Sequence, residues 1–463
     1  MPIYANLLRS CVVLLALLAA HASPAAGRAH FPLRISAEGP YLEDADGKPF
    51  LITGDTAWSL IADLSAEDAD HYLSDRKARG FNTILVSLIE HEFARNAPNN
   101  AEGIAPFLAP GDFSQPNHRY FTAAERVLDA ALKANMLVLL APAYVGANGG
   151  SQGWYSEMAA AGPEALRSYG RYVGKRYAHY PNIIWVQGGD YDPPDRDLIA
   201  ALASGIAEGA PGAMQTVHGN RDTVTGVYWP DAGWLALDTV YTYEDVASAT
   251  LARYRAGPSR PFFLIESRYE NEHGVDAAEI RKMAYGALLS GASGQVYGNN
   301  PVWHFDGPAL YAAPTGWREA LGSDGAESIS HLQALFGRFD WWKLKPDEGR
   351  FARMVEGAPS ATAISAVADD GSFAVVYLYD AVSIDLNFAV FARSPATVEW
   401  YDPSTGRTVP SDRHARDGQA RLGVPATSNA SGATDWILVV RIIPGAGGHH
   451  TRDEYFLLLG EAT

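Results

Sequence analysis

The sequence predicts an α/β protein in which a (β/α)8 TIM barrel is followed by a C-terminal β-sandwich. Between residues 49 and 298, eight short apolar or β-branched runs alternate with longer stretches of helical period. After about Trp342 the helical periods vanish, and alternating runs such as FAVVYLYD and DWILVVRIIP follow at short spacing. A chain of 463 residues has room for a barrel of ~250 residues with insertions and for a second module.

The N-terminal segment has the pattern of a secretory signal peptide. Arg9 precedes an apolar stretch from Cys11 to Ala20, and the small residues Ala20 and Ala22 mark a cleavage site. That stretch is about half of the ~20 residues that a spanning helix needs, so no membrane anchor is expected after cleavage. The chain has one cysteine, Cys11, and we therefore expect no disulfide or thiolate site after removal of residues 1–22. These features predict a periplasmic or secreted protein.

The remaining elements are expected in the following order. Residues 31–342 form the barrel with an N-terminal hairpin that turns at Asp46-Gly47, residues 343–443 form the β-sandwich, and residues 444–463 form a tail. The eight predicted barrel strands are Pro49 to Gly54, Phe81 to Ile89, Met136 to Ala143, Ile183 to Gly188, Met214 to His218, Thr239 to Tyr243, Phe262 to Glu266 and Gly294 to Gly298. The clearest helical stretches are Ala66 to Arg79, Tyr120 to Ala134, Pro163 to Tyr177 and Ala277 to Leu289.

The amino-acid composition indicates which kinds of ligand and partner the protein is expected to bind. The 36 basic and 53 acidic residues give a net charge of −17, and no Lys/Arg stripe is present, so we expect no nucleic acid partner. The 11 Trp and 23 Tyr suit a surface that binds carbohydrate. No HExxH motif, EF-hand loop or glycine-rich phosphate loop occurs, so we expect no metal and no cofactor. The oligomeric state is left open.

Two carboxylates stand at the ends of predicted strands, where the reacting groups of a barrel lie. Asp190 follows the fourth run and Glu266 ends the seventh, which places them on opposite sides of one axial pocket. A separation of ~5 to 5.5 Å gives a retaining glycosidase and ~6.5 to 9.5 Å an inverting one, and the sequence does not fix the distance. Two structural alternatives are a Glu266–Arg268 ion pair and a helix cap at Asp190.

The chain contains the motifs GDTAW (Gly54 to Trp58), GFNTILV (Gly80 to Val86), PAYVG and QGWYSEM (Pro142 to Met158), YPNIIWVQGGD (Tyr180 to Asp190) and YGNNPVW (Tyr297 to Trp303). They resemble the apiosidase-like glycoside hydrolases, which include glycoside hydrolase family 140 and carry a C-terminal collagen-binding-type β domain. The resemblance covers nearly the whole chain after the signal peptide. It implies a retaining clan A hydrolase with Asp190 as acid/base and Glu266 as nucleophile. The chain departs from the family after strands three and six, where it has Gly146 to Gly149 and Tyr243 to Val246, and both loops border the sugar.

Polar and aromatic residues near the strand ends are candidates for sugar contact, because hydroxyls pair with carboxylates and amides and aromatic faces cover a sugar ring. Each aromatic residue has packing as its alternative role, and His218 could equally brace a carboxylate. The candidates are Asp55, Trp58, Trp154, Gln187, His218, Tyr243, Tyr297, Asn300 and Trp303.

Together, the carboxylate pair and the resemblance predict an exported retaining glycoside hydrolase. The expected substrate is an oligosaccharide or polysaccharide, and the resemblance implies removal of a terminal branched or furanose sugar, such as apiose, from plant cell-wall glycan. Two alternatives stay open: an arabinofuranosidase or other exo-glycosidase on the same barrel, and an inactive protein that binds glycan.

Overall fold

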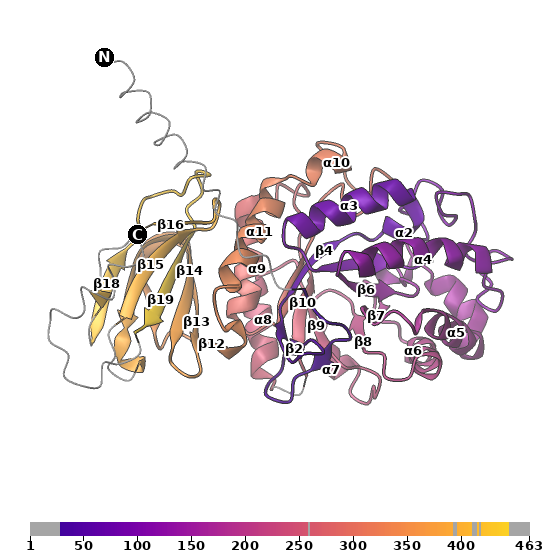
Figure 1. Ribbon diagram of the computed structural model, residues 1–463, viewed down its shortest axis with the longest axis horizontal. Coiled ribbons are helices and arrows are strands. Elements are labelled where there is room, and N and C mark those ends of the chain that lie inside the picture. The colour runs from indigo at the N-terminus through magenta and orange to yellow at the C-terminus, as the bar shows by residue number, and fades with distance from the viewer. Residues whose placement is uncertain (1–27, 258–259, 392–395, 410–413, 416–417, 444–463) are drawn as a thin grey trace, which may run out of the picture.

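The structure is a computed structural model that describes residues 28–257, 260–391, 396–409, 414–415 and 418–443. The expected signal peptide, including Cys11, and the expected tail at 444–463 lie outside these residues. Figure 1 shows two parts side by side, a barrel surrounded by helices and a smaller domain of strands. The predicted fold, a (β/α)8 barrel followed by a C-terminal β-sandwich, is confirmed as a barrel followed by a domain of antiparallel strands.

The barrel is formed by eight parallel strands in the order β8-β7-β6-β5-β4-β11-β10-β9. The two end strands approach each other, since the backbone N–H of Ala236 and the hydroxyl of Thr239 donate to carbonyls of β8 at 2.8 and 2.7 Å. All eight runs read from the sequence contain a strand. The bounds are β4 Ile52–Thr56, β5 Thr83–Ser87, β6 Leu137–Ala141, β7 Ile183–Gly188, β8 Gln215–His218, β9 Asp238–Tyr241, β10 Phe262–Glu266 and β11 Gly294–Tyr297.

Helices follow the strands and cover the outside of the barrel (Figure 1). Ser65, Asn117 and Asp276 cap three of them with side-chain oxygens that accept backbone N–H bonds. One helix, α5, starts earlier than the sequence indicates and breaks at Gly162, directly before the predicted start at Pro163. The helices are α2 Leu60–Asp63, α3 Ala66–Ala78, α4 His118–Lys133, α5 Tyr155–Tyr177, α6 Arg196–Gly209, α7 Thr225–Tyr228, α8 Val246–Arg255, α9 Ala277–Leu289, α10 Trp317–Ala320 and α11 Asp324–Phe336.

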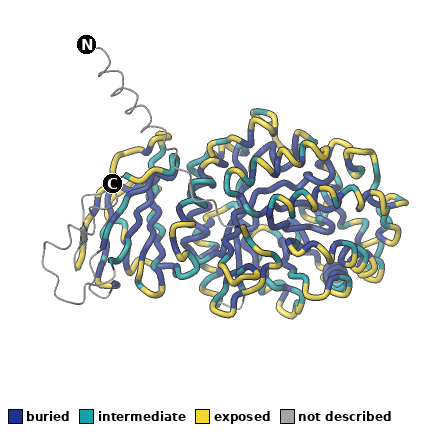
Figure 2. Tube along the Cα trace, viewed as in Figure 1, coloured by how far each residue is buried: buried dark blue, intermediate teal, exposed yellow. Residues whose placement is uncertain are grey.

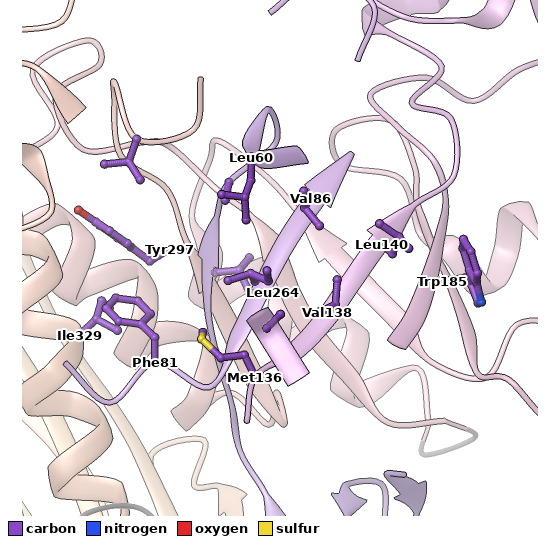
Figure 3. Packing of buried hydrophobic residues seen from close by; sticks show 14 of the residues in the cluster. Leu60, Phe81, Val86, Met136, Val138, Leu140, Trp185, Leu264, Tyr297 and Ile329 are labelled. Atoms are coloured by element: carbon purple, nitrogen blue, oxygen red, sulfur yellow. The ribbon is translucent and has the colours of Figure 1, made fainter. Parts of the chain in front are cut away.

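Successive side chains of each barrel strand point to opposite faces, so every strand contributes to two apolar layers. Inside the barrel, residues such as Leu139, Val186 and Phe263 form one buried cluster. Between strands and helices, residues such as Val138, Trp185 and Leu264 form another, part of which Figure 3 shows. Whether a polar residue near a strand end faces the pocket or a helix therefore depends on its place in this alternation.

The N-terminal hairpin is present as a small antiparallel sheet. It consists of β1 Arg34–Ile35, β2 Leu42–Glu43 and β3 Pro49–Phe50, with the predicted turn at Asp46-Gly47 between β2 and β3. The first predicted run is consequently shared, because Pro49 and Phe50 belong to β3 and the barrel strand begins at Ile52.

The C-terminal part is one connected antiparallel sheet rather than two separately bonded sheets. The long strand β14 pairs with β19 through its first half and with β18 through its second half. Side chains from these strands enclose a separate apolar core that includes Val376, Leu386, Leu422 and Leu438. The strands are β12 Leu344–Pro346, β13 Ala352–Ala368, β14 Phe373–Asn387, β15 Ala396–Asp402, β16 Arg407–Val409, β17 His414–Ala415, β18 Gln419–Gly423 and β19 Trp436–Ile442.

The other face of this sheet packs on the barrel, and the junction is buried (Figure 2). Apolar residues of β14 and β19, among them Val375 and Val439, join the same cluster as the barrel helices. In the middle of the junction, Arg281 of α9 forms two bonds of 2.6 and 2.8 Å to Asp435, and both side chains are almost fully buried. This bidentate pair fixes the orientation of the β domain. Among the residues that the structure describes, no helix combines the length and the apolar character needed to cross a membrane.

Candidate active site

Asp190 and Glu266 converge at the carboxyl-terminal mouth of the barrel. One carboxylate oxygen of Asp190, one of Glu266 and one ring nitrogen of His218 all lie within 4.8 Å of one another. Glu266 ends β10 and is 6% exposed, and Asp190 lies two residues beyond β7. The two carboxylates that the sequence singled out therefore face one another across a small space.

An irregularity in β10 aims Glu266 into this space. Phe263 and Ile265 face the barrel interior, so strict alternation would turn Glu266 outward, toward the helices. The register between β10 and β9 shifts after Leu264: Leu264 pairs with Val240, and Glu266, two residues on, pairs with Tyr241, the next residue of β9. Such a bulge rotates the next side chain, and it allows Glu266 to reach His218.

The Gly188-Gly189 pair shapes the turn that carries Asp190. Both glycines have positive φ, 81° and 129°, and a Cβ on Gly189 would lie 2.1 Å from the ring of Tyr144. Asp190 also has positive φ, 47°, in the region that Asp tolerates better than most residues. The turn brings Asp190 and Tyr144 together, and the Tyr144 hydroxyl donates to Asp190 Oδ2 at 3.0 Å. The other oxygen, Oδ1, is enclosed and has no protein partner.

Glu266 is held by two donors. His218 Nε2 donates to Oε2 at 2.7 Å, and the Tyr243 hydroxyl donates to Oε1 at 3.3 Å. Burial, followed by the negative charge of Asp190, raises the pKa of Glu266, while the two donors oppose this rise. Burial alone would lower the pKa of His218, but the bond and charge of Glu266 outweigh it and raise the pKa. His218 thus braces Glu266, one of its two expected roles.

His218 also connects Glu266 to the Asp190 turn. Its Nδ1 lies 3.3 Å from the backbone N–H of Asp190 and 3.1 Å from the carbonyl of Gly219. Both structural alternatives for the carboxylates are excluded, because Arg268 pairs with Glu279 and the residue that precedes α6 is Asp195. Neither a helix cap at Asp190 nor an ion pair between Glu266 and Arg268 therefore accounts for these two carboxylates.

A wall of aromatic residues lies beside the pair. Trp58 packs against His218 with ring centres 5.8 Å apart, and its Nε1 donates to the Tyr269 hydroxyl at 3.1 Å. Trp303 packs against Tyr269, but Trp58 and Trp303 are only 8% and 6% exposed. Only an edge of each indole is thus available to a ligand.

A third carboxyl, Glu272, borders this wall and was not expected from the sequence. Trp303 Nε1 donates to its Oε1 at 3.0 Å, and within the described residues no partner is found for its other oxygen. Burial raises the pKa of Glu272 to about 7, and the nearby charge of Glu266 adds to the effect. Glu272 lies in the loop after β10, six residues past Glu266, where strand periodicity gives no guide to position.

Three expected sugar contacts lie elsewhere, because strand alternation turns them toward the helices. The Asp55 carboxylate accepts from Tyr72 of α3 at 2.7 Å and lies 3.5 Å from Arg76. Gln187 donates to Gln215, which in turn donates to a carbonyl of α6. The third residue, Tyr297, donates to Glu270 and lies beside Phe81 and Ile329 (Figure 3). All three side chains are therefore buried within the barrel wall.

Two further candidates are parts of the packing. Trp154 is 2% exposed and lies among Phe107 and Phe113, with its Nε1 3.4 Å from the carbonyl of Ile89. Asn300 is completely buried, and its side chain bonds to His304 at 2.8 Å. Of the nine expected sugar contacts, the structure brings Trp58, His218, Tyr243 and Trp303 around the carboxylate pair.

Asp190, His218 and Glu266 are the one group in the described part of the chain with the composition and spacing of a metal site. Within this group, His218 Nε2 directs its proton toward Glu266 Oε2, so this nitrogen is engaged with the carboxylate. The arrangement suits acid/base and nucleophilic chemistry: one enclosed carboxylate with two donors faces a second carboxyl that has an unpartnered oxygen.

Comparison with known proteins agrees with this geometry. Residues 353–441 match the family model described as "Putative collagen-binding domain of a collagenase". A solved structure named "Glycoside hydrolase" aligns with a TM-score of 0.76 and 22% identity over 89% of this chain and 96% of its own. A glycoside hydrolase family 5 structure from Bacteroides vulgatus aligns with a TM-score of 0.77 and 20% identity, over 92% and 98%.

These two structures share the fold with this chain. No curated protein sequence matches it. The family model for the apiosidase-like catalytic domain matches residues 36–343, which is the greater part of the sequence. The chain therefore belongs to the apiosidase-like family and is a glycoside hydrolase.

Proposed function

We propose that the protein is a retaining exo-glycosidase that removes a terminal branched or furanose sugar, of the apiose type, from plant cell-wall glycan. The observation that carries the mechanism is the short separation of Asp190 and Glu266, whose oxygens lie within 4.8 Å of each other. Retaining enzymes place their two carboxyl groups ~5 to 5.5 Å apart, whereas inverting enzymes leave room for a water molecule between carboxyl and sugar.

In the first step Glu266 attacks the anomeric carbon while Asp190 passes its proton to the departing oxygen. The glycosidic bond breaks, and an ester forms between the sugar and Glu266. In the second step Asp190 takes a proton from water, whose oxygen attacks the anomeric carbon and releases Glu266. The donors from His218 and Tyr243 favour the ionised form of Glu266, which the attack requires.

The substrate class rests on the family and on the form of the pocket. Trp58, Trp303 and Glu272 offer two indole edges and a carboxylate oxygen, which suit one sugar residue with free hydroxyls. The family name supports apiose, a branched furanose, as the sugar. The pattern of residues 1–22 supports export to the periplasm or the medium, where such glycans are found.

The test is product analysis with pectic and hemicellulosic glycans, followed by proton NMR of the first-formed product. We expect release of a single terminal sugar with the anomeric configuration of the substrate. Release of arabinofuranose instead would correct the sugar and keep the mechanism, and an inverted product would contradict the role of Glu266. Absence of turnover on every glycan, with binding retained, would identify an inactive glycan-binding protein.

A further inference from the structure

A cavity of about 290 Å³ lies where the β domain meets the rim of the barrel. Its lining comes from the loop between β9 and α8, from the start of α8, from the second residue after β10, from α9 and from β13. The two domains therefore build it together. The residues that matter for the argument are Tyr243, Glu244, Arg268, Lys282, Thr362 and Ile364.

Tyr243 connects this cavity to the carboxylate pair. Its hydroxyl donates to Glu266 at 3.3 Å, and the same side chain contributes to the wall of the cavity. A ligand in the cavity is consequently separated from the reacting carboxylate by one tyrosine.

The polar groups in the wall suit uncharged sugar residues. Glu244 is exposed at the rim, and Arg268 and Lys282 are half-buried, so the wall carries both acceptors and donors. Arg268 uses one nitrogen for Glu279, at 2.6 Å, while its Nε is enclosed and unpartnered. Lys282 lies over the ring of Tyr379 at 4.7 Å, which holds its ammonium group in place. Mixed donors and acceptors of this kind bind vicinal hydroxyls.

The shape of the cavity is fixed by the domain junction. Thr362 and Ile364 lie on the face of β13 that is turned toward the barrel, and Thr362 is paired in register with Tyr379. Nearby, the buried Arg281–Asp435 pair holds the sheet against α9. A rigid wall of this kind loses little entropy on binding.

We propose that this cavity is a second sugar-binding region, which receives uncharged residues of the substrate glycan beyond the sugar that is released. The inference rests on the proposed function and assigns the β domain a direct part in substrate binding. It goes beyond a bracing role, because it predicts that substitutions on β13 affect long substrates and leave short ones unchanged.

The test compares two substrates, an oligosaccharide of the glycan found to be cleaved and an aryl glycoside of the released sugar. Thr362→Trp fills the cavity, and Val355→Trp places the same bulk on an exposed part of β13 outside the lining. We expect Thr362→Trp to raise KM for the oligosaccharide about tenfold, equivalent to about 1.4 kcal/mol, with KM for the aryl glycoside and kcat unchanged. The control Val355→Trp should behave as the wild type.

A KM for the oligosaccharide that stays at the wild-type value in Thr362→Trp, with intact folding, would overturn the inference. So would a loss of kcat on the aryl glycoside, since the substitution would then act through Tyr243 on Glu266. If Thr362→Trp does not fold, Lys282→Leu replaces it, with the same expected split. Failure of the wild type to cleave any glycan would contradict the proposed function, whereas cleavage that is indifferent to both variants contradicts the second binding region alone.

Discussion

Two sets of buried polar residues lie at the strands of this barrel, and they have opposite surroundings. The inner set, Asp190, His218 and Glu266, faces the mouth and leaves one Asp190 oxygen unpartnered. The outer set includes Asp55 with Tyr72 and Arg76, and Tyr297 with Glu270, and faces the helices. The same residue types thus serve chemistry on one face of a strand and attachment of helices on the other.

The largest expected effect tests the inner set. Glu266→Gln removes the proposed nucleophile, so kcat should fall by about 10⁴-fold or more while the melting temperature stays near that of the wild type. Steady-state kinetics and circular dichroism measure the two. Tyr297→Phe is the matched control from the outer set, and it should keep the catalytic rate. Comparable losses of kcat in both variants would remove the distinction between the two sets.

The second effect tests the outer set. Arg76→Met leaves Asp55 buried without its cation, which should cost about 3–5 kcal/mol of unfolding free energy. Burial raises the pKa of Asp55 to about 6, and the charge of Arg76 opposes this. The pKa of Asp55 in the variant should therefore be higher still.

Since a raised carboxyl pKa favours the folded state at low pH and opposes it at high pH, the deficit of Arg76→Met should grow as pH rises above 6. Urea denaturation at pH 5 and pH 8 measures this. The kcat/KM of the folded fraction should stay near that of the wild type. A variant that is stable at pH 8 but inactive would place Arg76 in the site instead.

A smaller effect concerns the third carboxyl. Glu272→Gln replaces a charged acceptor of sugar hydroxyls by a neutral one, so KM should rise about tenfold with little change in kcat. Glu272 ionises as pH rises through about 7, and its carboxylate is the stronger acceptor. Wild-type KM should therefore fall between pH 6 and pH 8, and this change should be absent in Glu272→Gln. An unchanged pH dependence would exclude a contact between Glu272 and the sugar.

The smallest expected effect tests whether the hydrogen bond from Tyr243 helps to keep Glu266 ionised. Tyr243→Phe removes one donor that lowers the pKa of Glu266, so that pKa should rise. Because the ionised form attacks, the acidic limb of the kcat/KM profile should move to higher pH, with a loss of a few-fold at the optimum. A limb that moves to lower pH would show that Tyr243 does not donate to Glu266.

The eight barrel strands could be predicted because each is a short apolar run between helical stretches, a pattern that depends only on local sequence. Asp190 and Glu266 could be found because each stands at the end of such a run. The sequence pattern also allows the outward orientation of Asp55, Gln187 and Tyr297 to be predicted. They alternate with inward residues such as Ile52, Val186 and Val296, and this alternation predicts contact with helices.

Other parts of the site could not be predicted from local pattern. Alternation alone would turn Glu266 outward, and the bulge that corrects this is a feature of pairing between β9 and β10. Tyr144 and Glu272 reach the site from loops, whose paths depend on tertiary packing. Trp154 and Trp58 are both tryptophans in segments that follow a barrel strand, and the sequence does not distinguish them. Trp154 lies in the apolar core, because an indole can pack in a core as well as beside a sugar.

The most direct test of the central claim is covalent trapping at Glu266. The wild-type protein would be incubated with a slow fluorinated or epoxide analogue of the released sugar, and the labelled peptide identified by mass spectrometry. The account predicts one sugar adduct on Glu266, formed at a rate that follows the ionisation of this carboxyl. An adduct on Asp190, or on Asp55 of the outer set, would contradict it.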